Sequence, residues 1–457
     1  MSTTYANTAQ DAAAATRRER RAARPVGEVR RIAASTLLSS PDARAAIALH
    51  GTPLLLLEPD RVRAQYRRLH EALPFVRFHY AVKALCHDAV LATLADEGSG
   101  FGVATMEELT AVTALGISAR RIIHTHPIKK PAEIADAIRA GVRTFVVDNA
   151  TELAKFAGLA PDIGLLVRLR HRSSHGQNDA PHGQHDASHG QSDRRSEFGV
   201  GPFEAAHLIE QALAQGTRIA GFSFHLGSQL NDLGRFGDAI ADTLTLMDHL
   251  QGSYPVRFDT LDIGGGFPIA YDKAVAPIEA VADVIRPLLE PRRRELDIIA
   301  EPGRVLVAEA MTAVTSVVGV AERADGRWYY LDDGVGGAYS LVARDDVHPL
   351  VFAERELARR EPYAGTHRWA TLAGPSGDPA DIIAREALLP DLVPGDRVVS
   401  PAMGGYTVAT SASSHGRSAT RVAVMGTAPD SGSMAAVIAP QTVPYSLSPA
   451  SPSPGTM

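Results

Sequence analysis

Short runs of β-branched and aromatic residues alternate with longer runs rich in alanine, leucine and glutamate from about residue 50 to about residue 304. RFHYAVKA precedes DAVLATLADEG, for example, and GFGVAT precedes MEELTAVTALG. About seven strands can be counted from RFHYAVKA, and DIIAEPGR would be the next. Such alternation predicts a parallel sheet, because parallel strands need a crossover between them. We expect a (β/α)8 barrel, and a doubly wound open sheet is the alternative.

The pattern changes after residue 305, where segments rich in valine, threonine and tyrosine are separated by glycine, aspartate and proline turns. Such segments predict strands rather than helices. We therefore expect an α/β protein with four parts. They are a disordered or loosely helical N-terminal extension (1–45), the barrel (46–305), a mainly-β domain (306–445) and a disordered tail (446–457).

A repeat of HGQ interrupts the barrel pattern within residues 171–195, at His175, His182 and His189. Histidines can bind metal ions. These triplets lie among glycine and polar residues, however, and have no apolar face with which to order themselves. We interpret the segment as a flexible low-complexity loop rather than a metal site, and we predict no metal.

The composition limits the partners that the protein can have. Its 46 basic and 52 acidic residues give a net charge of −6, which argues against nucleic acid as the main partner. No apolar run approaches the ~20 residues that cross a bilayer, so we expect no membrane association. One cysteine, Cys86, allows no intrachain disulfide and suits a reducing cytoplasm. A small-molecule ligand is the expectation.

Lys83 lies in RFHYAVKA, a run that otherwise predicts a buried strand turning into a helix. An ionised, unpaired lysine in such a place is costly. In one interpretation its stem follows the strand end and its ammonium reaches solvent. In the other it is a Schiff-base lysine, because a partly desolvated amine loses its proton more readily and can attack a carbonyl.

Two further motifs also follow predicted strands. LDIGGGFP places Gly264, Gly265 and Gly266 where bare backbone amides can hold a phosphate, although glycines after strands are usually turns. FHLGSQ places His225 at a strand end with Ser228 nearby. A lone histidine is more often a satisfied core residue, so neither motif is decisive alone.

AEPGR places Glu301 and Arg304 on either side of a Pro-Gly turn, where a simple salt-bridged turn is the other interpretation. Together with Lys83 and the glycines, however, these are the groups needed to hold pyridoxal 5'-phosphate. The glycines anchor the phosphate, the lysine binds the aldehyde, and the carboxylate keeps the pyridine nitrogen protonated so that the ring can accept electrons. This combination favours the functional interpretation of Lys83.

Nine motifs support a resemblance to a known family. In chain order they are YAVKA, RIIHTHPIKK, FVVDNATEL, FHLGSQ, LDIGGGFP, EPGR, YYLDDGVGGAYS, GPSGDPAD and GDRVVSPAMGGYTVA. In this order and rough spacing the chain resembles the ornithine/diaminopimelate decarboxylase family, the fold-type III pyridoxal-phosphate enzymes. The resemblance runs from about residue 50 to about residue 425, and the C-terminal motifs are more similar to ornithine decarboxylase.

The resemblance implies specific roles. Lys83 would bind the cofactor covalently, His225 would stack on its ring, and Glu301 would pair with the pyridine nitrogen. The residues implied to hold the phosphate are Ser228, Gly264, Gly265, Gly266, Arg304 and Tyr406. The family also implies a cytoplasmic head-to-tail homodimer, in which Asp333 and Asp378 of the partner subunit would receive the distal ammonium of a basic amino acid. The implied activity is decarboxylation, in polyamine or other amino-acid metabolism.

Four positions depart from the family pattern. Gly377 stands where a proton-delivering cysteine is usual, Gly102 replaces an aspartate, Leu85 an asparagine and Glu197 a lysine. Three hypotheses remain open. The protein decarboxylates a basic amino acid such as ornithine or lysine with altered protonation; it is a racemase, epimerase or decarboxylation-linked transaminase; or it is a non-enzymatic, regulator-like homologue. The retained cofactor residues favour the first.

Overall fold

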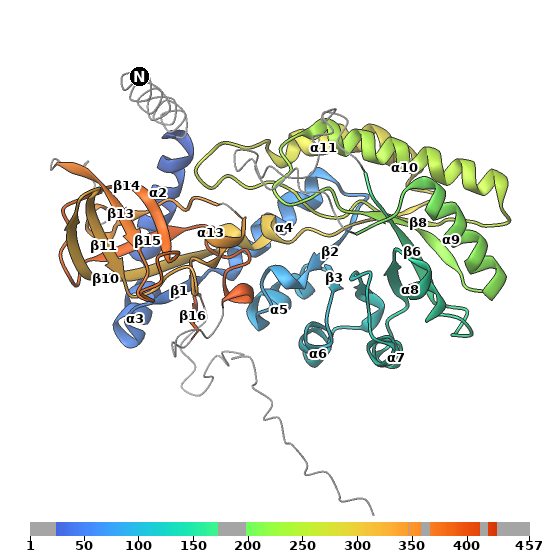
Figure 1. The fold of residues 1–457 in the computed structure, drawn as a ribbon, viewed down its shortest axis with the longest axis horizontal. Coiled ribbons are helices and arrows are strands. Elements are labelled where there is room, and N and C mark those ends of the chain that lie inside the picture. The colour runs from blue at the N-terminus through green and yellow to red at the C-terminus, as the bar shows by residue number, and fades with distance from the viewer. Residues whose placement is uncertain (1–23, 172–197, 346, 358–365, 412–418, 427–457) are drawn as a thin grey trace, which may run out of the picture.

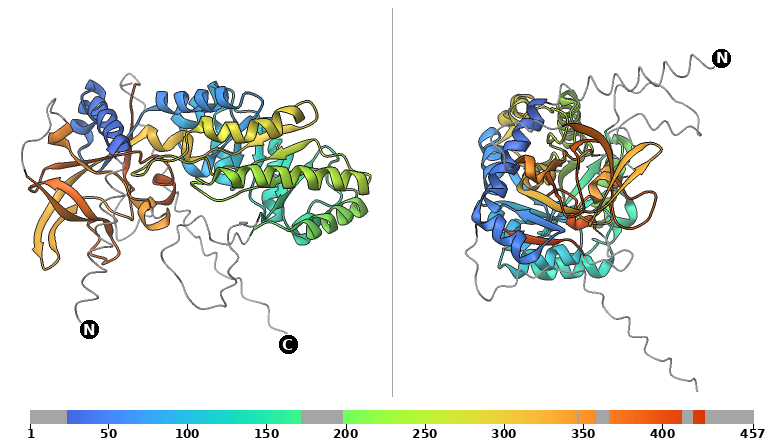
Figure 2. Two further views of the ribbon diagram at one scale, coloured as in Figure 1. Left: turned by 90° about the horizontal axis from the view of Figure 1, so that it is seen from above. Right: turned by 90° about the vertical axis from the view of Figure 1, so that its left-hand side faces the viewer.

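The computed structural model describes residues 24–171, 198–345, 347–357, 366–411 and 419–426. They form two lobes side by side, a closed barrel and a β-rich lobe that we call the β domain (Figure 1). The left view of Figure 2 shows the same division along the long axis of the molecule.

The barrel consists of eight parallel strands, and the last of them pairs back with the first. They are β2 (Arg77–Ala81), β3 (Gly100–Val103), β4 (Ile122–His124), β5 (Thr144–Val147), β6 (Gly164–Leu169), β7 (Ile219–Phe224), β8 (Thr260–Asp262) and β9 (Asp297–Ala300). The predicted (β/α)8 barrel is therefore confirmed, and the open-sheet alternative is wrong. All eight strands end at one rim, where barrel enzymes place their functional residues.

Helices surround the barrel because their apolar residues recur every three or four positions. In α11 (Ile278–Leu289), Val281, Ile285 and Leu289 are buried on one face. The other helices of the ring are α4 (Pro59–Ala72), α5 (Asp88–Asp96), α6 (Met106–Ala114), α7 (Pro131–Ala140), α8 (Ala150–Ala154), α9 (Pro202–Gln215) and α10 (Leu233–Ser253). The short α12 (Arg304–Val307) follows the last barrel strand.

The β domain contains a sheet in the order β12-β15-β10-β11-β13-β14, with β1 and β16 attached through β10. Its strands are β1 (Leu54–Leu57), β10 (Met311–Arg323), β11 (Gly326–Leu331), β12 (Phe352–Ala353), β13 (His367–Ala373), β14 (Ile382–Pro390), β15 (Arg397–Pro401) and β16 (Arg421–Val424). Short helices α13 (Ser340–Asp345) and α14 (Glu354–Leu357) interrupt it. The expectation of a second, mainly-β part is confirmed.

The N-terminal part of the chain differs from the prediction. We expected residues 1–45 to be disordered or loosely helical and the barrel to begin at 46, but α2 (Arg24–Leu38) and α3 (Pro41–His50) are regular helices. β1 pairs with β10 and β16, so it belongs to the β domain. Its four leucines are all buried, and an apolar run without alternation does not reveal which sheet it joins.

The helix α3 is fixed by a small apolar cluster at this end of the β domain. Ile47 of α3 packs with Leu54 of β1 and Val314 of β10. The HGQ histidines, the first 23 residues and the predicted tail at 446–457 lie outside the described residues. Among the residues that are described, no helix is long and apolar enough to cross a membrane.

Candidate active site

A cavity of about 280 Å³ lies at the rim where the barrel strands end. The lining residues come from at least five barrel strands or the loops after them, and one comes from the β domain. They are Ala81, Lys83, Ala104, Thr125, His126, Pro127, Arg168, Phe198, His225, Ser228, Gly266, Phe267, Glu301, Gly303, Arg304 and Tyr406. Of the predicted site residues, the structure brings Lys83, His225, Ser228, Gly266, Glu301, Arg304 and Tyr406 to this cavity.

Lys83 follows strand β2 in a single helical turn that spans Val82–Ala84. This turn aims the lysine at the cavity, while Val82 and Ala84 on either side of it are fully buried. Glu108, near the start of α6, accepts a hydrogen bond from the Ala104 backbone at 2.6 Å. Burial raises the pKa of Glu108, and the positive charge of Lys83 opposes that rise. Lys83 therefore has an acidic neighbour as well as access to the cavity.

His225 follows strand β7 and is held as a neutral imidazole. The backbone N–H of Gly265 donates to its Nδ1 at 3.3 Å, so the ring proton lies on Nε2. Burial, together with the nearby charges of Lys83 and Arg168, lowers the pKa of His225 to about 3. An uncharged, fixed ring is suited to packing against a flat aromatic ligand.

The three glycines after β8 lie where no side chain fits. A Cβ atom would approach the carbonyl oxygen of Phe224 to 2.1 Å at Gly264, that of Glu301 to 2.4 Å at Gly265, and that of Gly227 to 2.3 Å at Gly266. Gly264 and Gly266 also have positive φ angles of 68° and 93°. The close packing requires glycine, and it leaves the backbone itself to line this side of the site.

Glu301 enters the cavity directly after β9, and its backbone N–H donates to the Gly264 carbonyl at 2.6 Å. Nearby Asp262 accepts from Gly264 N at 2.8 Å through Oδ1, and its buried Oδ2 has no hydrogen-bond partner among the described residues. Burial and then the charge of Glu301 raise the pKa of Asp262 well above its ordinary value. Burial therefore disfavours the charged form of Asp262 next to Glu301.

Arg304 begins α12 and is buried, with its guanidinium surrounded by partners. It donates from Nε and Nη2 to Oγ of Ser228 at 3.3 and 3.2 Å, and from Nη1 to the Tyr271 hydroxyl at 3.1 Å. The ring of Tyr406 stacks on it at 4.7 Å, and Asp345 forms an ion pair with it. Burial alone would lower the pKa of Arg304, but Tyr271 and Asp345 raise it, so it remains a cation.

Tyr406 reaches the barrel from the β domain. Its backbone N–H donates to the carbonyl of Ala84 at 2.9 Å, next to Lys83. It adopts a φ of 60°, which is uncommon for a tyrosine and is found mostly where the surroundings enforce it. The β domain therefore completes one wall of the cavity.

These groups fit pyridoxal phosphate. A buried arginine, a serine hydroxyl and glycine backbone too crowded for side chains suit a phosphate, and a neutral histidine, a lysine and a carboxylate suit its aldehyde-bearing ring. Burial also disfavours a second negative charge at Asp262, beside Glu301. The donor set is thus complete on one rim of the barrel.

Asp333 and Asp378, the predicted substrate residues, do not line this cavity. Asp333 is buried and accepts from the backbones of Gly334 and Ala338 at 2.8 and 3.0 Å, and burial raises its pKa. Asp378 is exposed and accepts from Ala380 N at 2.8 Å.

Two departures from the family pattern have a visible local setting. Gly377 has a φ of 78°, and a Cβ there would meet nothing within 4 Å, so backbone conformation rather than space favours glycine. Leu85 is fully buried, and its carbonyl accepts from the hydroxyl of Tyr80 at 2.9 Å. Glu197 lies outside the described residues.

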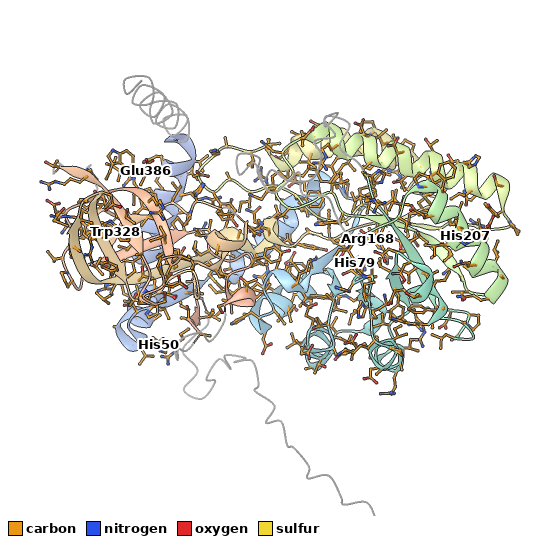
Figure 3. All side chains as sticks on the ribbon, viewed as in Figure 1. His50, His79, Arg168, His207, Trp328 and Glu386 are labelled. Atoms are coloured by element: carbon orange, nitrogen blue, oxygen red, sulfur yellow. The ribbon has the colours of Figure 1, made fainter. Side chains whose placement is uncertain are left out.

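The sequence analysis missed several cavity residues. Thr125 and His126 follow β4, and the Nδ1 of His126 lies against the backbone of Ile128. Arg168 lies in β6 under the ring of Phe198, at 5.4 Å from its centre, and Figure 3 labels Arg168 in the barrel. Burial lowers the pKa of Arg168, and the charges of Glu301, Asp148 and Asp262 oppose this. Their position at strand ends was the one available signal.

The comparisons with known proteins agree with this site. The family described as "Pyridoxal-dependent decarboxylase, pyridoxal binding domain" matches residues 59–308. The chain is 29% identical to a lysine/ornithine decarboxylase of Selenomonas ruminantium, over 78% of this chain and 85% of the relative. It is 31% identical to antizyme inhibitor 2 of Xenopus laevis, over 78% and 77%.

A similar fold is found among solved structures. The lysine/ornithine decarboxylase of Vibrio vulnificus, complexed with cadaverine, has a TM-score of 0.75 and 37% sequence identity. The similarity covers 84% of this chain and 98% of that one, so it includes both the barrel and the β domain.

Proposed function

Because this chain belongs to the family of pyridoxal-dependent decarboxylases, we propose that it removes the α-carboxylate of a basic amino acid such as ornithine or lysine, releasing CO₂ and an amine. The cofactor is pyridoxal 5'-phosphate. One observation carries the proposal: Lys83, His225, Glu301 and Arg304 line a single cavity, although they follow three strands, β2, β7 and β9, that are far apart in the sequence.

Each of these residues has a proposed task. Arg304, Ser228 and Tyr406 hold the phosphate, together with the backbone of Gly264, Gly265 and Gly266. His225 packs against the ring and keeps it flat in the cavity. Bound pyridoxal phosphate supplies an electron sink for the pair released when the bond to the carboxylate breaks.

Glu301 and Lys83 handle the charges and protons. Glu301 is the carboxylate that holds a proton at the pyridine nitrogen, since it lines the cavity whereas Asp262 does not. Lys83 places its primary amine in the cavity, where Nζ can bind the cofactor's aldehyde and, once displaced, exchange a proton. The neutral His225 contributes shape without a competing charge.

A homodimer would supply the groups that recognise the substrate. Among the described residues, the cavity is lined by Lys83, Arg168 and Arg304 and by one carboxylate, Glu301, which suits an anionic cofactor better than a distal ammonium. We propose that Asp333 and Asp378 of the partner subunit complete the site and select a basic side chain. We place the enzyme in the cytoplasm.

The fate of the substrate carbon after CO₂ leaves depends on its reprotonation. Gly377 cannot supply the proton that a cysteine would, so a carbonyl product from misplaced protonation is the first competing outcome. The similarity to antizyme inhibitor 2 raises a non-catalytic role as the second. Retention of Lys83, Glu301 and Arg304 in one cavity favours catalysis over that role.

The test is incubation of the cofactor-loaded protein with basic L- and D-amino acids in heavy water, with products identified by mass spectrometry. An amine shorter by one CO₂ and carrying one deuterium on carbon supports the proposal. A deuterated amino acid with all its carbons would indicate racemisation, and a carbonyl product would indicate transamination. No turnover of any substrate would contradict the proposed activity.

A further inference from the structure

The phosphate anchor Arg304 is held by residues from three separate parts of the chain. Ser228 lies in the loop after β7, Tyr271 lies in the segment after β8, and Asp345 is the last residue of α13 in the β domain. All three guanidinium nitrogens donate a hydrogen bond. The direction in which Arg304 faces is therefore set by its neighbours.

Asp345 is the one anion among these partners. Its carboxylate accepts from Nη2 of Arg304, and its side chain is 20% exposed against 5% for the arginine. The α13 helix that carries it is anchored at its other end, where the Ser340 hydroxyl lies 3.0 Å from the Thr407 carbonyl and 2.8 Å from Oγ1 of Thr410. The β domain thus fixes the position of this carboxylate.

The same hydrogen bonds fix the direction in which the Ser228 hydroxyl points. Its oxygen accepts two N–H groups of Arg304, so its own hydrogen is left to donate toward the cavity that both residues line. This arrangement requires the Nε and Nη2 edge of the guanidinium to face Ser228. Asp345, bound to Nη2, holds that edge in place.

We infer that Asp345 is a positioning residue, which fixes the Arg304 guanidinium and, through it, Ser228 toward the cofactor's phosphate. The β domain thereby increases cofactor affinity through a residue that does not line the cofactor cavity. The inference rests on the proposed function, because it takes pyridoxal phosphate as the ligand. It adds a residue that none of the family motifs includes.

Asp345 carries a negative charge, which would by itself repel a phosphate. The carboxylate is partly exposed, so water screens this repulsion, whereas its contact with the buried guanidinium is direct. Removing one partner of a buried ion pair leaves the other charge uncompensated and free to reorient. Orientation therefore outweighs repulsion, and loss of Asp345 weakens the binding of the phosphate.

The test measures dissociation constants of pyridoxal phosphate and of pyridoxal, which lacks the phosphate, by equilibrium dialysis. Asp345→Ala is expected to weaken the binding of pyridoxal phosphate about tenfold, which is the scale of a hydrogen bond to a charged group. The binding of pyridoxal is expected to stay unchanged. Asp345→Asn keeps an acceptor oxygen of the same shape and is expected to restore most of the affinity. Glu354→Ala, which breaks an ion pair with Arg397 elsewhere in the β domain, is the matched control.

A double variant tests whether Asp345 acts through Arg304. In an Arg304→Gln background, Asp345→Ala should weaken pyridoxal phosphate no further, because the group that it orients is gone. Equal loss of pyridoxal and pyridoxal phosphate would indicate general damage to the fold and would overturn the inference. Unchanged or tighter binding of pyridoxal phosphate by Asp345→Ala would also overturn it. Failure of the wild-type protein to bind pyridoxal phosphate would instead contradict the proposed function.

Discussion

A Cβ atom at Gly102 would lie 3.1 Å from Oε2 of Glu301, so glycine at this position leaves room for the carboxylate proposed to face the pyridine nitrogen. The same atom would lie 3.2 Å from Cγ2 of Thr125. The space where the family pattern has an aspartate is thus partly filled from the neighbouring strand. The chain has lost one carboxylate from this corner of the site without leaving a void.

Adding a side chain at Gly102 is expected to disturb Glu301. Gly102→Ala should weaken the binding of pyridoxal phosphate by about threefold to tenfold, because overpacking shifts a neighbouring side chain by a few tenths of an ångström. Gly102→Asp should weaken it more, since a second ionised carboxylate would face Glu301. Equilibrium dialysis measures both effects. Thr125→Ala combined with Gly102→Ala should recover part of the affinity, and no recovery would contradict this packing.

Lys83→Ala is expected to abolish the visible absorbance of the covalently bound cofactor, because no second lysine lines the cavity in the part of the chain that the structure describes. Reduction with borohydride followed by peptide mass spectrometry should attach the cofactor to Lys83 in the wild-type protein and nowhere in the variant. Lys130→Ala alters a lysine whose side chain is 82% exposed and serves as the control. An unchanged spectrum in Lys83→Ala would contradict the cofactor assignment.

Three buried histidines predict that the protein loses stability in acid. Burial lowers the pKa of His79, His124 and His225 to about 3, whereas each takes up a proton near its ordinary value of 6.5 when the chain unfolds. Unfolding therefore binds protons between pH 6.5 and pH 3, so the free energy of unfolding falls as the pH falls through this window. Each histidine contributes a slope of roughly 1.4 kcal/mol per pH unit. Urea unfolding at several pH values measures the total slope of the free energy of unfolding against pH.

His124→Phe is expected to stabilise the protein at neutral pH. Both ring nitrogens of His124 are buried without a hydrogen-bond partner among the described residues, and its ring stacks on Phe145 at 5.9 Å. A phenylalanine keeps the stacking and removes two unsatisfied polar atoms, which is worth about 1 kcal/mol. Urea unfolding should also show a shallower acid slope. A less stable variant would mean that the histidine has a partner after all.

The sequence predicted the catalytic end of the barrel well for a physical reason. Lys83, His225, Glu301 and Arg304 each follow a strand in a short motif, and parallel strands bring their carboxyl ends to one rim. Thr125, His126 and Arg168 lie at the same rim, but the motif RIIHTHPIKK assigned no role to Thr125 or His126, and Arg168 lies in none of the motifs. The role of Asp345 depends on how the two lobes meet, which no local pattern contains.

The N-terminal part of the chain shows another reason why a sequence pattern does not predict every strand pairing. A buried strand reads as LLLL whichever sheet it joins, so its pairing with β10 and β16 depends on contacts far along the chain. Asp333 has a predicted substrate role through its motif, and the structure adds how its carboxylate is held. Its oxygens accept three hydrogen bonds, two from backbone N–H groups and one from Thr420, and such local bonds cannot be read from composition.

Lys129 supports the loop that carries Thr125 and His126, and its loss is expected to destabilise the protein. Its side chain is fully buried and donates to the carbonyls of His126, Pro127 and Val146 at 2.9, 3.1 and 2.6 Å. Its Nζ also lies 3.6 Å from Glu152. Lys129→Met removes these three hydrogen bonds and half of a buried ion pair, so we expect a loss of about 3 kcal/mol in the free energy of unfolding.

The pH dependence of the free energy of unfolding of Lys129→Met distinguishes the effect of this ion pair from the effect of side-chain packing. Burial lowers the pKa of Lys129 to about 8, while its ordinary value is 10.5. Between these values the unfolded chain holds the proton and the folded chain does not, so this group makes wild-type stability rise with pH. The variant lacks that rise, and the difference between the two proteins should therefore be larger at pH 9.5 than at pH 7 in urea unfolding. If the difference in the free energy of unfolding between the two proteins were the same at both pH values, Lys129 would act through its shape. A buried charge would instead make that difference change as the lysine loses its proton.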